Sequence, residues 1–363
     1  MQGQILASFV HGYADPTTEV TGTAPAMVVI SDDGRVELKH LFFPRVASDF
    51  INIPNLLGEP PEGDSYKHLA SVPRLGLTGL AREEDSGAIV AGSHTGVFVF
   101  HADLTEKAFI SHRLLADPHG LTISNGAIFT ALPELDLVVK TDLQGNVRGL
   151  WQIGGDLRIR EPDIRDLPSD DFRLRGKGRR GPMGRFHFNN VEVSEGAISV
   201  TSRNIGAALR FREQDDVAEL LPIAHHSPAL LHDGVSFRGL VYFTSVDGKL
   251  LTVDPESYTA DYFYRQGEAP AAHHPFAASS SILRMRDVLG RDVNWMRGLD
   301  VTESNFVTTV DGIYGSSTFS IIDIRRSDMS FREYPISWEM LKPAGELRFA
   351  SGFDCLDLRD AAT

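Results

Sequence analysis

A short pattern recurs six times along this chain and limits the folds that it can adopt. Each copy starts with a polar residue, mostly followed by glycine and then an apolar residue. The six copies start at Thr78, His119, Asn189, Asp233, Arg297 and Ser351. Most copies continue into a hairpin-like run, then a third strand as at 97–100 or 207–211, and a fourth as at 148–153 or 259–264. Four strands per repeat, joined by turns, predict the blades of a β-propeller.

The last copy predicts how the ring closes. Only 12 residues follow Ser351, which is too few for a whole blade. Three strand-like segments stand at the other end of the chain, at 4–10, 26–31 and 35–43. A C-terminal strand that pairs with these three would complete a blade and protect its edges. The sequence therefore predicts an all-β fold, a single six-bladed β-propeller domain over residues 1–363. The alternatives are an open all-β sandwich and two smaller β domains.

Charge and cysteine content exclude several classes of protein. The net charge of −14 argues against general nucleic-acid binding, which depends on cationic groups that neutralise phosphates, and against docking on anionic membranes. The single cysteine, Cys355, excludes an intramolecular disulfide and is expected to be a small buried hydrophobe in a strand. The N-terminal residues show no secretory pattern, and no apolar run reaches the length of a membrane span. We expect a cytoplasmic protein.

The alternation of side chains along the inner strands predicts which residues face the central channel. The third and fifth residues of each copy are mostly apolar and are expected to pack between blades. The fourth residues are expected to face the channel, and they include Glu192, Asp300 and Asp354. Three carboxylates on one ring repel one another unless water, a cation or bound protons compensate. A water-filled polar channel without function is the simpler interpretation.

The six start residues are predicted to surround one mouth of the channel. Loops between the second and third strands open on the same face and add polar side chains: His11, His94, Glu134, Arg203, Asn204, Asp247 and Tyr314. Asn, Asp, Glu and His together indicate a cation site, and their oxygens favour Ca²⁺. Histidines around His119, such as His187 or His232, would instead suit a transition metal. Alternatively, these polar residues cap strand turns.

Three long connections, 44–77, 153–188 and 265–296, lead into repeat starts and are predicted to lie over that mouth. Long loops are often functional, and these could form a lid. The segment 172–185 carries six basic residues and no acid. It is predicted to hold an anionic substrate or a protein partner. The alternative is a flexible, solvent-exposed loop.

The starts Asn189-Asn190-Val191 and His232-Asp233-Gly234-Val235 resemble those of the SMP-30/gluconolactonase and strictosidine-synthase-like propellers. In that superfamily, Asn and Asp at inner-strand starts bind a catalytic Ca²⁺, and members hydrolyse lactones or phosphoesters or perform metal-free condensation. The resemblance implies that Asn189 and Asp233 are metal ligands. It also implies that His119, where relatives often place Asn, is a ligand or a general base.

The leading hypothesis is a metal-dependent, lactonase-like hydrolase that acts on a small and possibly anionic substrate at the mouth. Asn189, Asp233 and His119 would bind Ca²⁺ or another divalent metal, which polarises a carbonyl and activates water. His119 would serve as the general base, because imidazole titrates near neutral pH. Arg297 would stabilise developing negative charge.

Two further hypotheses need no metal. A lyase, isomerase or cyclase could use the same pocket, with His119 and either Glu134 or Glu192 as acid–base groups. A non-enzymatic propeller could instead bind a protein partner through 172–185. The residues leave the substrate and the oligomeric state open.

Overall fold

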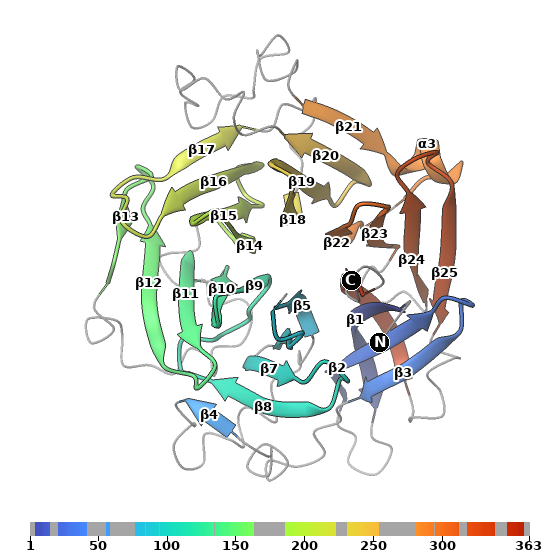
Figure 1. The fold of residues 1–363 in the computed structure, drawn as a ribbon, viewed down its shortest axis with the longest axis horizontal. Helices are drawn as coiled ribbons and strands as arrows, with labels where there is room; N and C mark the ends of the chain where they lie inside the picture. The colour runs from blue at the N-terminus through green and yellow to red at the C-terminus, as the bar shows by residue number, and fades with distance from the viewer. Residues whose placement is uncertain are drawn as a thin grey trace.

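The computed structural model describes residues 4–14, 21–41, 56–58, 77–83, 85–93, 95–133, 135–162, 186–222, 231–253, 280–293, 295–311, 318–337 and 347–358. Six sheets stand around a central axis, each with one strand next to that axis (Figure 1). The predicted all-β, six-bladed propeller is confirmed. Among the described residues, no helix has the length and apolarity needed to cross a membrane.

We number the blades in chain order and list their strands from the axis outward. Blade 1 contains β5 (Leu77–Arg82), β6 (Ile89–Ser93), β7 (Gly96–Phe100), β8 (Glu106–Ser111) and β4 (Leu56–Gly58). Blade 2 contains β9 (Leu121–Ser124), β10 (Ala127–Leu132), β11 (Leu137–Asp142), β12 (Val147–Ile153) and β13 (Ile159–Arg160). Blade 3 contains β14 (Phe188–Ser194), β15 (Ala197–Ser202), β16 (Ala207–Arg212) and β17 (Glu219–Pro222).

The remaining blades follow the same order. Blade 4 contains β18 (Leu231–Phe237), β19 (Leu240–Ser245), β20 (Lys249–Val253) and β21 (Ser280–Arg284), and the helix α3 (Met285–Leu289) follows β21. Blade 5 contains β22 (Arg297–Val301), β23 (Asn305–Val310), β24 (Thr318–Arg325) and β25 (Phe331–Ser337). Blade 6 contains β26 (Leu347–Asp357), β1 (Gln4–Ala14), β2 (Thr21–Ser31) and β3 (Val36–Leu41).

Blade 6 closes the ring as the sequence predicts. Its inner strand β26 comes from the C-terminus and pairs antiparallel with β1, from Ile5 opposite Asp357 onward. Cys355 of β26 is fully buried, and its thiol donates to the carbonyl of Val307 at 3.3 Å, which confirms its expected role as a buried hydrophobe. The two chain ends therefore stabilise each other by backbone hydrogen bonds within one sheet.

Apolar side chains fill the space between neighbouring blades. The described residues form six hydrophobic clusters, one at each junction between adjacent blades. Leu121 and Ile123 of β9 pack against blade 1, and Leu299 and Val301 of β22 pack against blade 4. These are the apolar positions of the repeat, so the predicted alternation is confirmed. Trp151 is the largest fully buried side chain and lies in the cluster between blades 2 and 3.

The inner strands approach one another so closely that some positions admit only glycine. A Cβ atom on Gly120 would lie 2.3 Å from Oδ1 and 2.4 Å from Cα of Asn190 on the next inner strand. Asn190 in turn donates from Nδ2 to the carbonyl of Gly234 at 2.5 Å. The repeated glycine after the start residue therefore reflects the narrowness of the channel.

The predicted long connections contain strands at the outer edges of blades. Within 44–77, β4 pairs in parallel with β8, and within 153–188, β13 pairs with β12. The fourth strand of blade 4 is β21 rather than the predicted 259–264, which lies outside the described residues. The serine-rich start of β21 conceals it in the sequence, but Ile282 and Leu283 pair with Leu251 and Leu250. The segment 172–185 also lies outside the described residues.

Candidate functional site

The starts of the inner strands gather at one mouth of the channel, because every blade begins at its inner strand. In four blades the pairing of the inner strand with its neighbour shifts by one residue near this start: at Thr78, at Asn189, at 232–233 and at Gly298. Such a β-bulge breaks strict alternation and turns side chains in new directions. It allows the adjacent residues His232 and Asp233 to contact each other.

His119 precedes β9 and forms a polar relay with the next blade. Its Nδ1 lies 3.0 Å from Oδ1 of Asn189, whose Nδ2 donates to the carbonyl of Leu231 at 2.8 Å. This second bond fixes the orientation of the Asn189 amide, so Oδ1 accepts and His119 Nδ1 carries a hydrogen. The other nitrogen of the His119 imidazole, Nε2, lies 3.5 Å from a carboxylate oxygen of Asp117. Each ring nitrogen of His119 therefore lies beside an acceptor oxygen.

His232 and Asp233 form a close polar pair at the mouth. Nδ1 of His232 lies 2.6 Å from Oδ2 of Asp233, and the same oxygen accepts the backbone N–H of Gly298 at 2.7 Å. Both side chains are buried. Because a carboxylate only accepts, the pair places a hydrogen on His232 Nδ1 and leaves Nε2 with the lone pair. An Asp–His pair of this kind is the arrangement that prepares a general base.

Burial keeps His232 neutral. Desolvation lowers the pKa of His232 to about 4, helped by the positive charge of Arg297, although Asp233 acts in the opposite direction. Nε2 of His232 is fully buried, and no described residue gives it a hydrogen bond. A buried acceptor without a partner costs roughly 1–3 kcal/mol. A ligand group that offers a hydrogen at this position would recover that free energy.

A third histidine completes the cluster. His187 has φ +55°, an uncommon conformation for a residue other than glycine. The carboxylate of Asp136 holds it there, because it accepts the N–H groups of Phe186 at 3.0 Å and of His187 at 2.9 Å. Desolvation and the neighbouring His119 lower the pKa of His187 to about 3. The His187 ring lies 5.2 Å from that of His119, which lies 6.3 Å from that of His232.

Arg297 supplies a positive charge at the start of β22. Its side chain is buried, and its guanidinium lies 4.5 Å from the centre of the Trp295 ring in a cation–π arrangement. The hydroxyl of Thr309 donates to the carbonyl of Arg297 at 2.8 Å and fixes the strand start. This rigid cation is suited to an anionic group or to developing negative charge.

Below the mouth, two of the three predicted channel carboxylates, Glu192 and Asp300, interact, whereas the side chain of Asp354 lies outside the described residues. Glu192 interacts with the side chain of Thr122, the backbone N–H of Ser236 and the charge of Asp300. Desolvation and Asp300 raise the pKa of Glu192 to about 8, against the opposing effect of the two hydrogen bonds. Glu192 is therefore protonated at neutral pH. Its bound proton removes one of the negative charges that would otherwise repel each other in the channel.

The predicted calcium ligands are engaged by hydrogen-bond donors. The N–H groups of His232 and Gly298 point at Asp233 Oδ2, and that of His119 points at Asn189 Oδ1. These hydrogens carry partial positive charge where a cation would need free oxygen atoms. In the part of the chain that the structure describes, no group of three or more His, Cys, Asp or Glu is placed to hold a metal. The arrangement does not fit Ca²⁺, which stays a sequence-based prediction.

The other predicted residues divide into two groups. Glu134, His94 and Tyr314 lie outside the described residues. The prediction that His11 lies in a loop is wrong, because β1 continues through it and pairs it with Ala24 and Ala350; its side chain is not described. Arg203 and Asn204 belong to the turn after β15, where their N–H groups donate to the carbonyls of His187 and Phe186. The structure thus brings together His119, Asn189, Asp233 and Arg297. Sequence reasoning missed the contact between His232 and Asp233, for which their adjacency in the chain was the available signal.

Comparison with solved structures supports the fold. A protein of unknown function from Bacteroides caccae is 11% identical with a TM-score of 0.52, over 97% of this chain and 99% of that one. A chain of the nidogen/laminin complex is 10% identical with a TM-score of 0.51, over 97% and 98%. Virginiamycin B lyase from Staphylococcus aureus is 10% identical with a TM-score of 0.43, over 92% and 89%. No family model and no curated protein matches the sequence. The first two likenesses support the fold alone.

Proposed function

We propose that this propeller is an enzyme with its active site at the histidine-lined mouth of the channel, and that it works by acid–base chemistry without a metal, as a lyase, isomerase or cyclase. The observation that carries the proposal is the His232–Asp233 pair. Asp233 holds the imidazole in one tautomer, and Nε2, to which no described residue donates, is the atom that would accept a proton.

Each residue at the mouth has a defined task in such a reaction. His232 Nε2 accepts a proton from a carbon next to a carbonyl, and the electron pair moves onto the carbonyl oxygen. Asp233 keeps the imidazole in its productive tautomer and stabilises the imidazolium that forms. Arg297 stabilises the negative charge on the oxygen. His119, held by Asp117 and Asn189, returns a proton to carbon or to a leaving group.

The same residues suggest the class of substrate. Arg297 is a buried cation whose charge acts on His232, and burial favours the neutral form of both His232 and His187. A small molecule with a carbonyl and an anionic group would match this charge. It would also offer the acidic hydrogen that His232 needs. Nothing in the described residues favours a protein-binding function over this one.

The tautomer of His232 can be tested without knowing the substrate. Long-range ¹H–¹⁵N NMR at pH 7 is expected to show His232 neutral, with its hydrogen on Nδ1, and His101, an exposed histidine on the other side of the ring, provides a reference signal. A His232 ring protonated on both nitrogens at pH 7 would remove the general base and refute the proposal.

Turnover separates the proposal from the calcium-dependent hydrolase. Against a panel of lactones, keto acids and hydroxy acids, His232→Gln is expected to lose roughly 10²–10⁴-fold in kcat, whereas His101→Gln keeps full activity. A strong chelator should leave turnover unchanged. If the chelator abolishes turnover and Ca²⁺ restores it, Asn189 and Asp233 are metal ligands and the acid–base proposal is wrong.

A further inference from the structure

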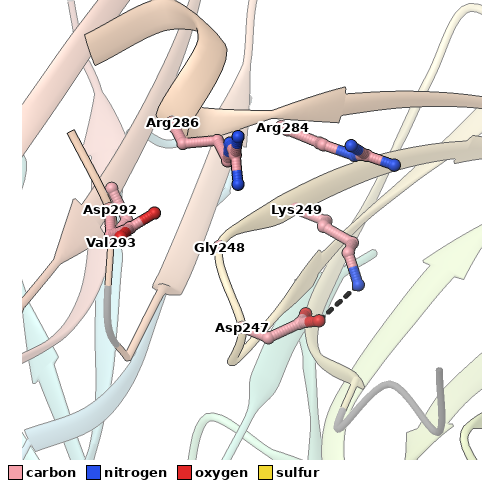
Figure 2. Close-up of a pocket in the computed structure, with 7 residues that line it drawn as sticks. All are labelled: Asp247, Gly248, Lys249, Arg284, Arg286, Asp292 and Val293. Carbon is pink, nitrogen blue, oxygen red and sulfur yellow. Dashed lines mark hydrogen bonds and ion pairs between the residues drawn. The ribbon is translucent and has the colours of Figure 1, made fainter. Parts of the chain in front are cut away.

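A pocket of about 360 Å³ shares no lining residue with the histidine cluster at the mouth. It is formed between the turn that joins β19 to β20 and the segment 284–293 that leads from β21 to β22 (Figure 2). The N–H of Trp295 donates to the carbonyl of Val246 at 3.0 Å and ties the two walls together. This contact places the pocket near the mouth of the channel, because Trp295 lies only two residues before Arg297 in the chain.

The floor of the pocket is firmly built. Gly248 has φ +81°, and a Cβ atom on it would lie 3.2 Å from both Cβ and the carbonyl oxygen of Val293. The N–H of Met285 donates to the carbonyl of Gly248 at 2.9 Å, which seats the start of α3 on the turn. Val293 is buried beneath the opening. The walls are thus held in place by backbone contacts before any ligand binds.

The charges around the pocket are unusual for a protein with a net charge of −14. Lys249 and Arg284 are direct cross-strand partners on β20 and β21, a placement in which like charges repel. Lys249 forms an ion pair with Asp247. Burial raises the pKa of Asp247, but hydrogen bonds from Lys249 and Ser245 outweigh it, so the pKa falls and the carboxylate stays charged. This acid neutralises Lys249 and leaves Arg284.

Two guanidinium groups remain available. Arg284 is exposed, and among the described residues no acid is paired with it. Arg286 is also exposed, and its ion-pair partner Asp287 lies 3.6 Å away, beyond hydrogen-bond distance. Figure 2 shows both arginines and Lys249 on one side of the pocket and Asp292 on the other. Among the described residues that line the pocket, the three cations are accompanied by two acids, Asp247 and Asp292, so one positive charge is in excess.

We propose that this pocket binds a phosphate group, free or esterified. Guanidinium groups present parallel N–H donors that match phosphate oxygens, and a phosphate monoester carries close to two negative charges at neutral pH. A dianion would balance the charges of Arg284 and Arg286, because Asp247 already neutralises Lys249. The cavity lies within the size range of small-ligand sites, so it can also hold an organic group attached to the phosphate. This inference does not depend on the proposed function.

Isothermal titration of the full chain with sodium phosphate at low ionic strength tests the site. We expect saturable binding, weakened roughly tenfold or more by Arg284→Met and by Arg286→Met, because each removes hydrogen bonds to a charged group. Arg332→Met is the matched control, since Arg332 is exposed on β25, the outer strand of the next blade. It changes the net charge equally and should leave the affinity unchanged.

Two further arms define the chemistry. Comparing the affinity for phenyl phosphate with that for inorganic phosphate shows whether the site prefers an esterified or a free phosphate. Acetate should bind much more weakly than either. Arg284→Lys keeps the charge but not the paired donors, so it should bind with intermediate affinity, and circular dichroism verifies that each variant is folded. The proposal is overturned if phosphate shows no saturable binding, if acetate binds as tightly, or if Arg332→Met weakens binding as much as Arg284→Met.

Discussion

The protonated Glu192 in the channel makes a quantitative prediction for the stability of the fold. Its pKa rises from 4.5 to about 8 on folding, because the channel desolvates the carboxyl group and Asp300 repels its charge. Glu192→Gln keeps the shape of the side chain and an oxygen that can accept the Ser236 N–H, but it cannot ionise. The variant therefore isolates the free energy that this one proton contributes.

The sign follows from proton binding in the two states. Between pH 4.5 and 8 the folded protein holds this proton and the unfolded chain does not, so the contribution is fully present below pH 4.5 and is lost as pH rises through 8. At 1.36 kcal/mol per pKa unit, the loss is about 3 kcal/mol at pH 7 and about 5 kcal/mol above pH 8, both upper bounds because solvent reaches part of the side chain. Glu192→Gln should therefore be the more stable protein at pH 8.

Urea denaturation at several pH values from 4.5 to 8.5 measures the effect. The stability of Glu192→Gln minus that of the wild type should grow with pH, while the m-value stays constant. Glu219→Gln is the matched control, because Glu219 is exposed on β17 of the same blade, and its profile should run parallel to the wild type. Parallel profiles for Glu192→Gln, or a variant that is less stable at pH 8, would refute the assigned protonation.

Two further substitutions test the packing of the ring. Trp151→Ala should destabilise the protein by about 3–5 kcal/mol through the cavity left between blades 2 and 3, whereas Val217→Ala, at a side chain 53% exposed, should change stability by less than about 0.5 kcal/mol in the same denaturation assay. Gly120→Ala should cost about 1–3 kcal/mol because its Cβ would strike the backbone of Asn190, but Gly154→Ala, which meets only a movable side chain, should cost less. Equal melting temperatures for the two glycine variants would contradict the close approach of the inner strands.

Much of the architecture could be predicted from the sequence because it is encoded in local patterns that repeat. The alternation of Leu121 and Ile123 with polar neighbours marks a strand that packs on one side, and six copies of that pattern imply a ring. The short sixth copy implies closure by the N-terminal strands, as β26 and β1 show. Alternation also places Glu192 and Asp300 on one ring, since side chains two residues apart share a face.

The chemistry of the mouth was decided by tertiary structure. The partners of its polar groups come from other blades: Asn189 lies 70 residues from His119, and Gly298 lies 65 residues from Asp233. A local pattern can predict that these residues share a mouth but not which atoms they bond. The bulge at 232–233 that joins His232 to Asp233 is likewise a feature of pairing with β19. Sequence therefore determined where polar groups gather, and the closed ring determined which of them contact one another, because their partners come from other blades.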